Sequence, residues 1–430
     1  MTPKSSHRAP ISTTSRRMFL GSTAAVTAAA SLAACGGGGD SGSVSGSSEI
    51  VLWMYPVVPD ENNSQEFWNK VKDDFNSKNE DVQLAIELLP WDGRDEKIAT
   101  AIAGKEGPDI VLLTPDLTLN YFTTGGLKPV DKAIESIKDD FLPSSLEAVT
   151  FEGGLYGVPI YNTSTTTAYN KKLFEEAGID ALPETWDEVK AAAPALAEKG
   201  VVAMDYVGSP NMTLNLSFYP LLWQAGGTVF TEDGSDIAFD GPEGVEVLQF
   251  LVDLKGMGGI PEDAATKDND VEGGGLGNGK TAMGYALSMS EVELMKAGVG
   301  EENVVVGQPL KNEEQASFGM PGVLALTAIN ENEDAAAKVL QYLASPEVTD
   351  ELIKIASQFS SLKDAAPPAD DEATKAFTEA LEYARPGEIY PKSRQVMEVL
   401  KPHIQSALQG DKTPEEAIKA AAEEARGVLG

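Results

Sequence analysis

The sequence contains one cysteine, Cys35, and two histidines, of which only His403 follows the first 34 residues. A single cysteine cannot form an intramolecular disulfide, and it offers the body of the chain neither a cysteine-based metal site nor a thiol nucleophile. One histidine does not suffice for a histidine-rich zinc site and makes a Ser-His-Asp triad unexpected. We therefore expect no catalytic residue, no metal site and no cofactor. Carboxylate pairs are abundant, so counting residues alone leaves a glycosidase open.

Basic residues are scarce relative to acidic ones, with 33 Lys and Arg against 67 Asp and Glu and a formal charge of −34. The first 34 residues hold four of the basic residues and no acidic one, so the remainder of the chain carries −38. Nucleic-acid binding requires a basic face, and so does docking on anionic lipid headgroups. We expect neither partner for the folded body.

Long apolar runs are also missing, apart from one at residues 18–34 that follows a basic segment. Its 17 residues fall short of the roughly 20 that a membrane-spanning helix needs. It leads into residues 32–36 (Leu-Ala-Ala-Cys-Gly), which resemble the lipobox of bacterial lipoproteins, where the cysteine is diacylated and becomes the first residue. Residues 15–21 (Ser-Arg-Arg-Met-Phe-Leu-Gly) match the twin-arginine export pattern. We predict an export signal at 1–34, and at 35–48 a lipidated Cys35 with a flexible Gly/Ser tether.

The rest of the chain is predicted to fold as an α/β protein with largely parallel sheets. Apolar runs typical of buried strands occur at 50–55, 82–88 and 109–113, with helical spacing between them. This β-α-β-α-β order indicates an α/β architecture. A body of roughly 380 residues is too long for one ordinary core, so two domains or lobes are expected. Further along, Thr185 and Glu188 have the spacing of a capping box and predict a helix start.

Short motifs follow one another along this body at 104–111 (Gly-Lys-Glu-Gly-Pro-Asp-Ile-Val), 125–130 (Gly-Gly-Leu-Lys-Pro-Val), 153–159 (Gly-Gly-Leu-Tyr-Gly-Val-Pro), 169–178 (Tyr-Asn-Lys-Lys-Leu-Phe-Glu-Glu-Ala-Gly), 183–188 (Pro-Glu-Thr-Trp-Asp-Glu), 224–227 (Gln-Ala-Gly-Gly) and 279–283 (Gly-Lys-Thr-Ala-Met). In sequence and in order they resemble the sugar-binding proteins of ABC importers related to maltodextrin-binding protein. The resemblance extends over essentially the whole mature chain.

The resemblance implies a two-lobe periplasmic-binding-protein fold, with a hinge of crossing segments and a ligand cleft between the lobes. It places lobe 1 at 49–160, lobe 2 at 161–312, a return to lobe 1 at 313–345, and C-terminal helices of lobe 2 at 346–430. Crossings are expected near 158–163, near 309–319 and near Ser345. Hinge closure around a ligand requires only that the ligand binds the closed form better.

The function implied is that of an extracytoplasmic substrate-binding lipoprotein of an ABC transporter. It would capture a carbohydrate, either a mono- or an oligosaccharide, and deliver it to the transmembrane subunits of the permease without acting as an enzyme. We expect a monomer that is lipid-anchored to the outer face of the cell membrane.

Candidate ligand contacts are aromatic and polar residues at the ends of predicted strands and at the hinge. Sugars present hydroxyl edges and apolar C–H faces, so their sites combine aromatic rings with carboxylates and amides. By their position, the candidates are Trp53, Tyr55, Trp91, Asp92, Asp116, Tyr161, Asn162, Thr163, Trp223, Tyr285, Ser288 and Tyr390. Structural roles are also open to them: Trp53, Trp223 and Tyr285 could be core residues, and Asp92 could cap a helix.

The sequence departs from the maltodextrin-binding pattern at three positions. Met289 and Met397 stand where that pattern has stacking tryptophans, and Leu117 follows Asp116 in place of an arginine. These departures argue against a linear maltodextrin and leave other saccharides open. The alternative is the same role for a non-sugar solute such as a polyamine or a peptide, which the aromatic candidates disfavour.

Overall fold

The computed structural model describes residues 47–91 and 93–430, and the fold is given for these alone. The predicted export signal, the lipidation site Cys35 and the candidate Asp92 lie outside the described residues. Within the described ranges, no helix combines the length and the apolar composition needed to cross a membrane.

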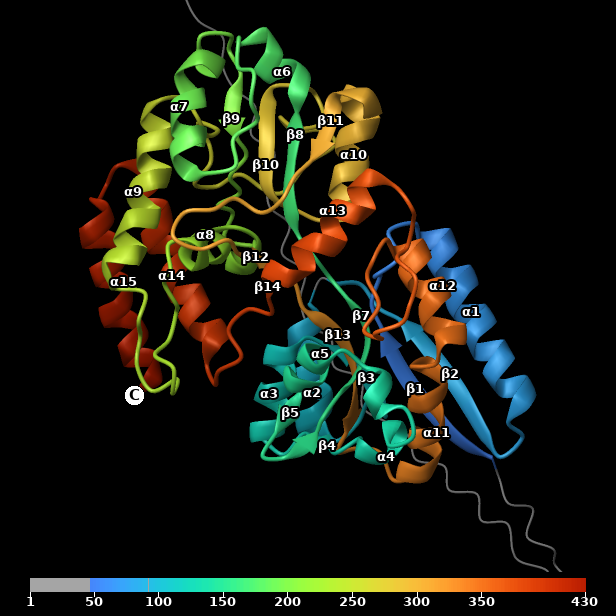
Figure 1. Cartoon of the computed structure of the whole chain (residues 1–430). Helices are drawn as coiled ribbons and strands as arrows, with labels where there is room; N and C mark the ends of the chain where they lie inside the picture. The colour runs from blue at the N-terminus through green and yellow to red at the C-terminus, as the bar shows by residue number, and fades with distance from the viewer. Residues whose placement is uncertain (1–46, 92) are drawn as a thin grey trace, which may run out of the picture. The chain divides into compact units, whose positions relative to one another are not determined.

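The first sheet contains the three strands predicted at the start of the body. β1 (Ser48–Met54), β2 (Val82–Leu88) and β3 (Ile110–Leu113) run parallel and are joined by α1 (Glu61–Lys78) and α2 (Arg94–Gly104). All four residues of β3 are apolar and buried, as expected of a strand covered on both faces. The predicted β-α-β-α-β order is confirmed (Figure 1).

Strands from distant parts of the sequence complete this sheet. Its order is β2-β1-β3-β13-β4, and β7 also pairs with β13. The added elements are β4 (Leu127–Lys128), β7 (Val158–Asn162) and β13 (Pro321–Thr327), with α3 (Pro115–Thr123), α4 (Asp131–Ile134), α5 (Pro143–Glu147), β5 (Thr150–Phe151) and β6 (Gly154–Leu155). The elements around this sheet are lobe 1, which is therefore built from separate stretches of the chain.

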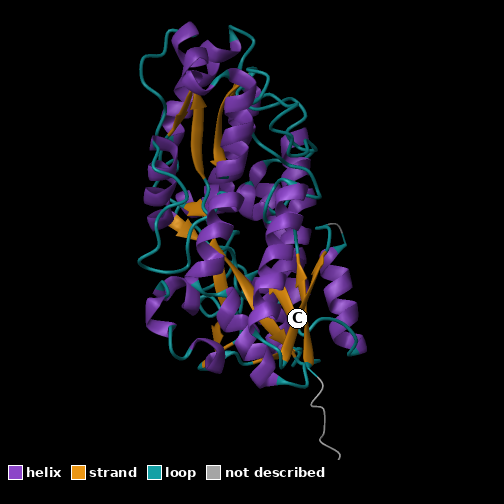
Figure 2. Cartoon of the chain, turned by 90° about the vertical axis from the view of Figure 1, so that its right-hand side faces the viewer, coloured by secondary structure: helices purple, strands orange, loops and turns teal. Residues whose placement is uncertain are grey.

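The second sheet has the strand order β11-β8-β10-β9, and the elements around it are lobe 2. Its elements are β8 (Thr166–Asn170), β9 (Val202–Met204), β10 (Thr281–Leu287), β11 (Val304–Val306), α6 (Lys171–Glu176), α7 (Trp186–Ala197), α8 (Phe218–Gln224), α9 (Pro242–Gly256) and α10 (Met289–Val299). The predicted capping box is confirmed at the start of α7, where Thr185 and Glu188 satisfy each other's backbone N–H groups. Figure 2 shows the strands of both sheets with helices packed around them.

The stretches that connect the lobes hydrogen-bond to one another where they cross. Asn162, which leaves lobe 1, exchanges two backbone hydrogen bonds with Phe359, at 2.6 and 2.9 Å. Its neighbour Thr163 donates its backbone N–H to the carbonyl of Met320 at 2.9 Å. Two short strands in this region, β12 (Ser317–Phe318) and β14 (Ala384–Arg385), pair in parallel. The hinge is thus a bonded junction of chain segments.

The remaining helices divide between the lobes. They are α11 (Glu333–Leu343), α12 (Pro346–Ala356), α13 (Glu372–Ala380), α14 (Ser393–Gln409) and α15 (Pro414–Leu429), and single turns of 3₁₀ helix lie at Lys138–Asp140, Leu214–Leu216, Glu301–Asn303 and Leu381–Tyr383. α12 buries Leu352 and Ile353 in the core of lobe 1, whereas α14 and α15 bury Leu400 and Ile418 in the core of lobe 2. The prediction that lobe 2 resumes at residue 346 is therefore wrong for α12, and the chain leaves lobe 1 after this helix. A helical period marks an apolar face but does not say which core covers it.

The substitution Leu352→Ala tests the assignment of α12. Leu352 is fully buried, and truncating such a side chain costs about 2–5 kcal/mol because a cavity remains. We expect hydrogen exchange to accelerate in β7 and α1, the lobe 1 elements that α12 contacts, while α14 and α15 stay protected. The control is Leu294→Ala on α10, because Leu294 is 41% exposed. Faster exchange in α14 and α15 instead would place α12 with lobe 2.

Candidate functional site

An exposed aromatic plate lies where β1 and β2 of lobe 1 end. The ring of Trp91 stacks on that of Tyr55 with 5.1 Å between centroids and 21° between planes. The guanidinium of Arg94 lies 5.2 Å from the centroid of Trp91 and 5.9 Å from that of Tyr55. Tyr55 is fully buried, whereas Trp91 is 44% exposed. Tyr55 and Arg94 therefore fix the position of the Trp91 ring, which remains partly exposed to solvent.

Burial raises the pKa of Tyr55 to about 12. Its hydroxyl has no hydrogen-bond partner among residues 47–91 and 93–430. The indole N–H of Trp91 donates to the carbonyl of Pro56 at 3.2 Å, which ties the plate to the loop after β1.

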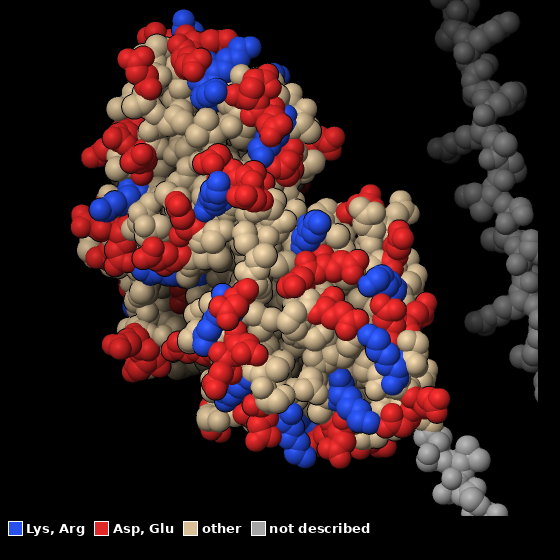
Figure 3. All heavy atoms as spheres, turned by 45° about the vertical axis from the view of Figure 1, so that its right-hand side comes forward, with Lys and Arg blue, Asp and Glu red and all other residues tan. Residues whose placement is uncertain are grey.

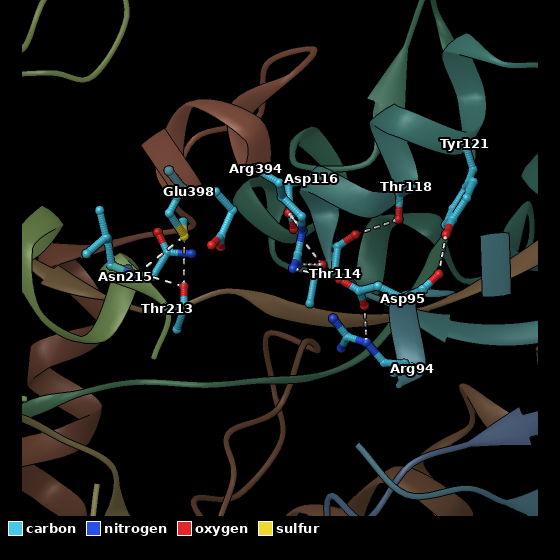
Figure 4. A network of polar contacts seen from close by, with 12 residues as sticks. Arg94, Asp95, Thr114, Asp116, Thr118, Tyr121, Thr213, Asn215, Arg394 and Glu398 are labelled. Atoms are coloured by element: carbon cyan, nitrogen blue, oxygen red, sulfur yellow. Dashed lines mark hydrogen bonds and ion pairs between the residues drawn. The ribbon is translucent and has the colours of Figure 1, made fainter. Parts of the chain in front are cut away.

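Two carboxylates of lobe 1 and a guanidinium of lobe 2 meet beside Arg94 (Figure 4). Asp116 lies in the first turn of α3, and Asp95 lies in the first turn of α2. Arg394, in the first turn of α14, donates from Nε to Asp116 at 2.6 Å and from Nη1 to Asp95 at 2.9 Å. It also donates from Nη2 to the hydroxyl of Thr114 at 3.3 Å. We call these residues the Arg394 cluster.

Together with Arg94, the Arg394 cluster is electrically balanced. Asp95 accepts from Arg394 on one oxygen and from Nε of Arg94 on the other, the latter at 2.7 Å. Burial by itself lowers the pKa of Arg394, because it disfavours the charged form. The nearby carboxylates of Asp116 and Asp95 have the larger effect and hold the pKa of the guanidinium above its ordinary value. Two arginines thus face two aspartates, and the carboxylates are available as acceptors without a net negative charge.

A second polar group of lobe 2 lies near α14. Met397 accepts, on its sulfur, from the hydroxyl of Thr213 at 3.5 Å and from the backbone N–H of Leu214 at 3.4 Å. Asn215 follows in the same turn, and its side-chain oxygen has no partner within the described part of the chain. Gly387 allows the close approach of the next loop, because a Cβ there would lie 2.9 Å from that oxygen.

Trp223 packs in the core of lobe 2, and its indole N–H contacts the half-buried carboxyl of Glu388. The side chain is 2% exposed and donates from Nε1 to Glu388 at 3.3 Å. The guanidinium of Arg385 lies 6.0 Å from the ring centroid of Trp223. Burial raises the pKa of Glu388 to about 6.

Three candidate residues of the hinge are engaged in holding the crossing segments. The side-chain amide of Asn162 donates to the hydroxyl of Ser145 at 3.0 Å, and the hydroxyl of Thr163 accepts from the backbone N–H of Met320 at 3.0 Å. Tyr161 is buried in the core of lobe 1. The structure gives these residues structural contacts and does not bring them into the Arg394 cluster.

The remaining candidates are also placed elsewhere. In lobe 2, Tyr285 is buried and donates its hydroxyl to the carbonyl of Ser217 at 2.6 Å, Ser288 caps α10, and Tyr390 donates to a backbone carbonyl at 3.0 Å. In lobe 1, Trp53 lies under the ammonium of Lys97, 4.6 Å from the ring centroid, in a separate hollow of about 450 Å³. Tyr55, Trp91 and Asp116 are the predicted residues that the structure does bring together.

Sequence reasoning missed Arg394 and Asp95. Arg394 and Asp116 are 278 positions apart, and no local pattern links an arginine of the C-terminal helices to an aspartate after the third strand. Asp95 had a weak signal, because it follows the predicted residues Trp91 and Asp92 at the start of a helix.

A wider hollow of about 1320 Å³ lies between β11, α10 and α13. Its lining carries charges of both signs, among them Glu293, Lys296 and Lys375, and includes Met289 but none of the candidate residues. Met289 thus faces this hollow and not the aromatic plate. Because aromatic and balanced polar groups converge at the Arg394 cluster, we take the cluster and the plate as the candidate site.

The substitution Glu388→Gln tests the half-buried carboxyl. Since its pKa is raised, the native chain binds more protons than the unfolded chain between about pH 4.5 and 6, so this group makes the protein less stable as the pH rises through that window. Gln cannot ionise but can still accept from Trp223. Relative to the unmodified chain, the variant should gain about 1–2 kcal/mol in the free energy of unfolding from pH 4.5 to 7, measured in urea.

The control for this measurement is Glu423→Gln, which is exposed on α15. It should follow the pH profile of the unmodified chain. A Glu388→Gln profile that stays parallel to the unmodified one would show that burial of this carboxyl is not linked to stability.

Comparisons with known proteins agree with this architecture. The family model described as bacterial extracellular solute-binding protein matches residues 59–350. A binding protein of Brucella abortus is 23% identical over 84% of this chain and 90% of its own length. The arabinooligosaccharide-binding protein of Halalkalibacterium halodurans is 26% identical over 49% of this chain and 46% of its own.

Among solved structures, an ABC transporter solute-binding protein from Thermotoga lettingae, bound with α-D-tagatose, superposes with a TM-score of 0.76 at 25% identity, covering 89% of this chain and 100% of that one. This similarity confirms the predicted two-lobe fold. The family model spans well over half of the sequence. The chain therefore belongs to the family of bacterial extracellular solute-binding proteins.

Proposed function

We propose that this chain captures a carbohydrate, a mono- or oligosaccharide, between its lobes and delivers it to the transmembrane subunits of an ABC permease. The observation that carries the proposal is the exposed ring of Trp91, fixed by Tyr55 and Arg94, next to the Arg394 cluster. An aromatic face suits the C–H surface of a sugar ring, and carboxylates suit its hydroxyl groups. The family and the fold are those of extracytoplasmic binding proteins, which supply recognition and transport and not catalysis.

The charge balance of the site favours a neutral ligand over a polyamine. A cationic solute needs free carboxylates, but Asp95 and Asp116 already face Arg94 and Arg394. Acidic residues are numerous over the face seen in Figure 3, with basic ones between them, so the acidic composition belongs to the general surface and does not itself indicate a cation site. Paired acceptors and donors still serve sugar hydroxyls, which both donate and accept hydrogen bonds.

The relatives support the carbohydrate class without naming the sugar. One is named for arabinooligosaccharides, and the superposed structure holds α-D-tagatose. These ligands differ in size. We therefore propose a carbohydrate as the ligand class of this chain and do not propose a particular sugar.

We further propose that the chain acts as a lipid-anchored monomer on the outer face of the cell membrane. Cys35, at the end of the predicted signal, would carry the acyl chains, and the Gly/Ser segment after it would hold the lobes off the surface. More than one acyl chain is needed for stable anchoring, which fits a diacylated cysteine.

The ligand class is tested by a thermal-shift screen of the protein against saccharides, polyols, polyamines, amino acids and peptides. A ligand at 100 times its dissociation constant adds about 2.7 kcal/mol of stability, which shifts the midpoint readably. We expect a shift with one class of saccharide, and the sugar should be recovered chemically unchanged. A shift with a polyamine or a peptide and none with any saccharide would end the carbohydrate proposal.

Trp91→Ala tests the aromatic plate. Stacking on an aromatic ring is worth about 0.5–1.5 kcal/mol beyond buried area, so affinity for the saccharide should fall about tenfold or more in calorimetric titration. Leu294→Ala, which truncates an equally exposed apolar side chain on α10, should bind as the unmodified chain does. Equal affinities of the two variants would remove Trp91 from the site.

Cys35→Ser tests the lipid anchor. In cells that export the chain, the unmodified protein should incorporate labelled fatty acid and sediment with membranes, while the variant does neither. A matched variant, Ser43→Ala, keeps the cysteine and should remain membrane-bound. Retention of the Cys35→Ser variant in the membrane fraction would show that another part of the chain anchors it.

A further inference from the structure

Arg394 differs from the other ion-paired residues in the part of the chain that the structure describes, because its partners lie in the other lobe. α14, which carries Arg394, packs in the core of lobe 2. Asp95 and Asp116 lie in the first turns of α2 and α3, which pack on the core of lobe 1. Every other ion pair in the described ranges joins groups on one lobe or within one connecting segment.

Arg426 provides the internal comparison. It also donates to two aspartates, Asp236 and Asp240, both at 2.7 Å, and to the carbonyl of Ile237 at 3.1 Å. The chemistry is the same as that of Arg394, but all four residues belong to lobe 2. The arrangement at Arg426 fastens a helix to its own lobe, whereas the arrangement at Arg394 fastens one lobe to the other.

The contacts of Arg394 also fix the geometry of the lobe 1 carboxylates. One oxygen of Asp116 accepts from the hydroxyl of Thr114, and the other accepts from Arg394. The two oxygens of Asp95 are divided between Arg94 and Arg394 in the same way. Each carboxylate thus has one contact within lobe 1 that survives separation of the lobes, and one contact that exists only when the lobes are together (Figure 4).

Opening of the hinge therefore changes the charge of the site. With the lobes apart, Asp95 keeps Arg94 and Asp116 keeps only the hydroxyl of Thr114, so lobe 1 presents a net negative patch. With the lobes together, Arg394 neutralises the patch and aligns both carboxylates. A cationic solute can bind the open patch, but it then opposes the approach of Arg394, because like charges brought together in a partly buried site repel. A neutral solute leaves this contact free to form.

We propose that Arg394 is the positioning residue that couples ligand specificity to closure of the lobes. It completes the lobe 1 half of the site only in the closed form. It selects neutral polyhydroxylated ligands because a bound cation prevents Arg394 from reaching Asp95 and Asp116. The selection step rests on the proposed sugar site, whereas the closing contact does not. A ligand shifts a conformational equilibrium only through its differential affinity for the two states, and Arg394 supplies that difference.

The closing contact is tested without any ligand. In the full chain carrying Cys35→Ser, spin labels are placed at Glu135→Cys on lobe 1 and Glu175→Cys on lobe 2, both exposed. We expect Arg394→Gln to shift the interlobe distance distribution toward longer values, and Arg394→Lys to restore part of the short-distance population by keeping the charge. Arg426→Gln, the matched loss of an arginine from two aspartates within one lobe, should leave the distances unchanged.

The salt dependence of the interlobe distance is a second measurement, and a merely structural role of Arg394 would leave it unchanged. Raising the salt concentration should shift the unmodified chain toward the distribution of Arg394→Gln and leave that variant as it was. Identical distances in Arg394→Gln and the unmodified chain, at every salt concentration, would overturn the proposal.

The selection step is tested by titrating spermidine and the saccharide identified in the screen. Arg394→Gln should lower saccharide affinity about tenfold and raise spermidine affinity, and adding Asp116→Asn should cost little more because the two residues act as one unit. Unchanged selectivity would overturn this part of the proposal. If no saccharide binds but Arg394→Gln still opens the cleft, the sugar assignment fails while the closing contact stands.

Discussion

The segments that cross between the lobes bond to one another, and this constraint shapes the rest of the molecule. Each lobe has its own sheet and core, and within residues 47–91 and 93–430 the two cores are separate clusters of buried side chains. At the crossing, the backbone of Asn162 bonds to that of Phe359, and Thr163 bonds to Met320. Buried backbone groups must be paired, and here they are paired across three separate passes of the chain. We expect the lobes to open and close by rotations that preserve this junction.

The same constraint explains why residues near the crossing look functional in sequence yet serve the fold. Gly322 is needed because a Cβ there would lie 2.0 Å from the ring of Tyr161, and Gly319 because a Cβ would lie 2.5 Å from the carbonyl of Thr163. Polar and aromatic side chains gather at the hinge to satisfy backbone and to fill the space left by glycine. Their polar groups are engaged in holding the junction together.

Features set by contacts between residues close in the sequence could be predicted, and features set by contacts between distant residues could not. The strands of lobe 1 and the start of α7 were predictable, because apolar runs and a capping box are local patterns. The placement of Tyr55, Trp91 and Asp116 near one another was predictable, because strand ends meet at one edge of a parallel sheet. The packing of α12 on lobe 1 was not, because an amphipathic helix fits either core. Arg394 was missed for the same reason: its partners are set by how two lobes meet, which no local pattern records.

An acidic protein that binds neutral solutes faces an electrostatic difficulty, and the Arg394 cluster shows how the fold resolves it. With a formal charge of −34, the surface attracts cations over long range, so carboxylates left bare in a cleft would collect cations in competition with the ligand. Placing one neutralising arginine on each lobe limits this, because Arg94 remains with Asp95 in any conformation while Arg394 arrives on closure. Added salt weakens both the long-range attraction and the contact at 2.6–2.9 Å, but the contact, being partly buried, needs more salt to break. The electrostatic field of the surface cannot distinguish solutes of like charge. Discrimination between ligands therefore depends on the short-range contact of Arg394, which forms only around a ligand that leaves room for it.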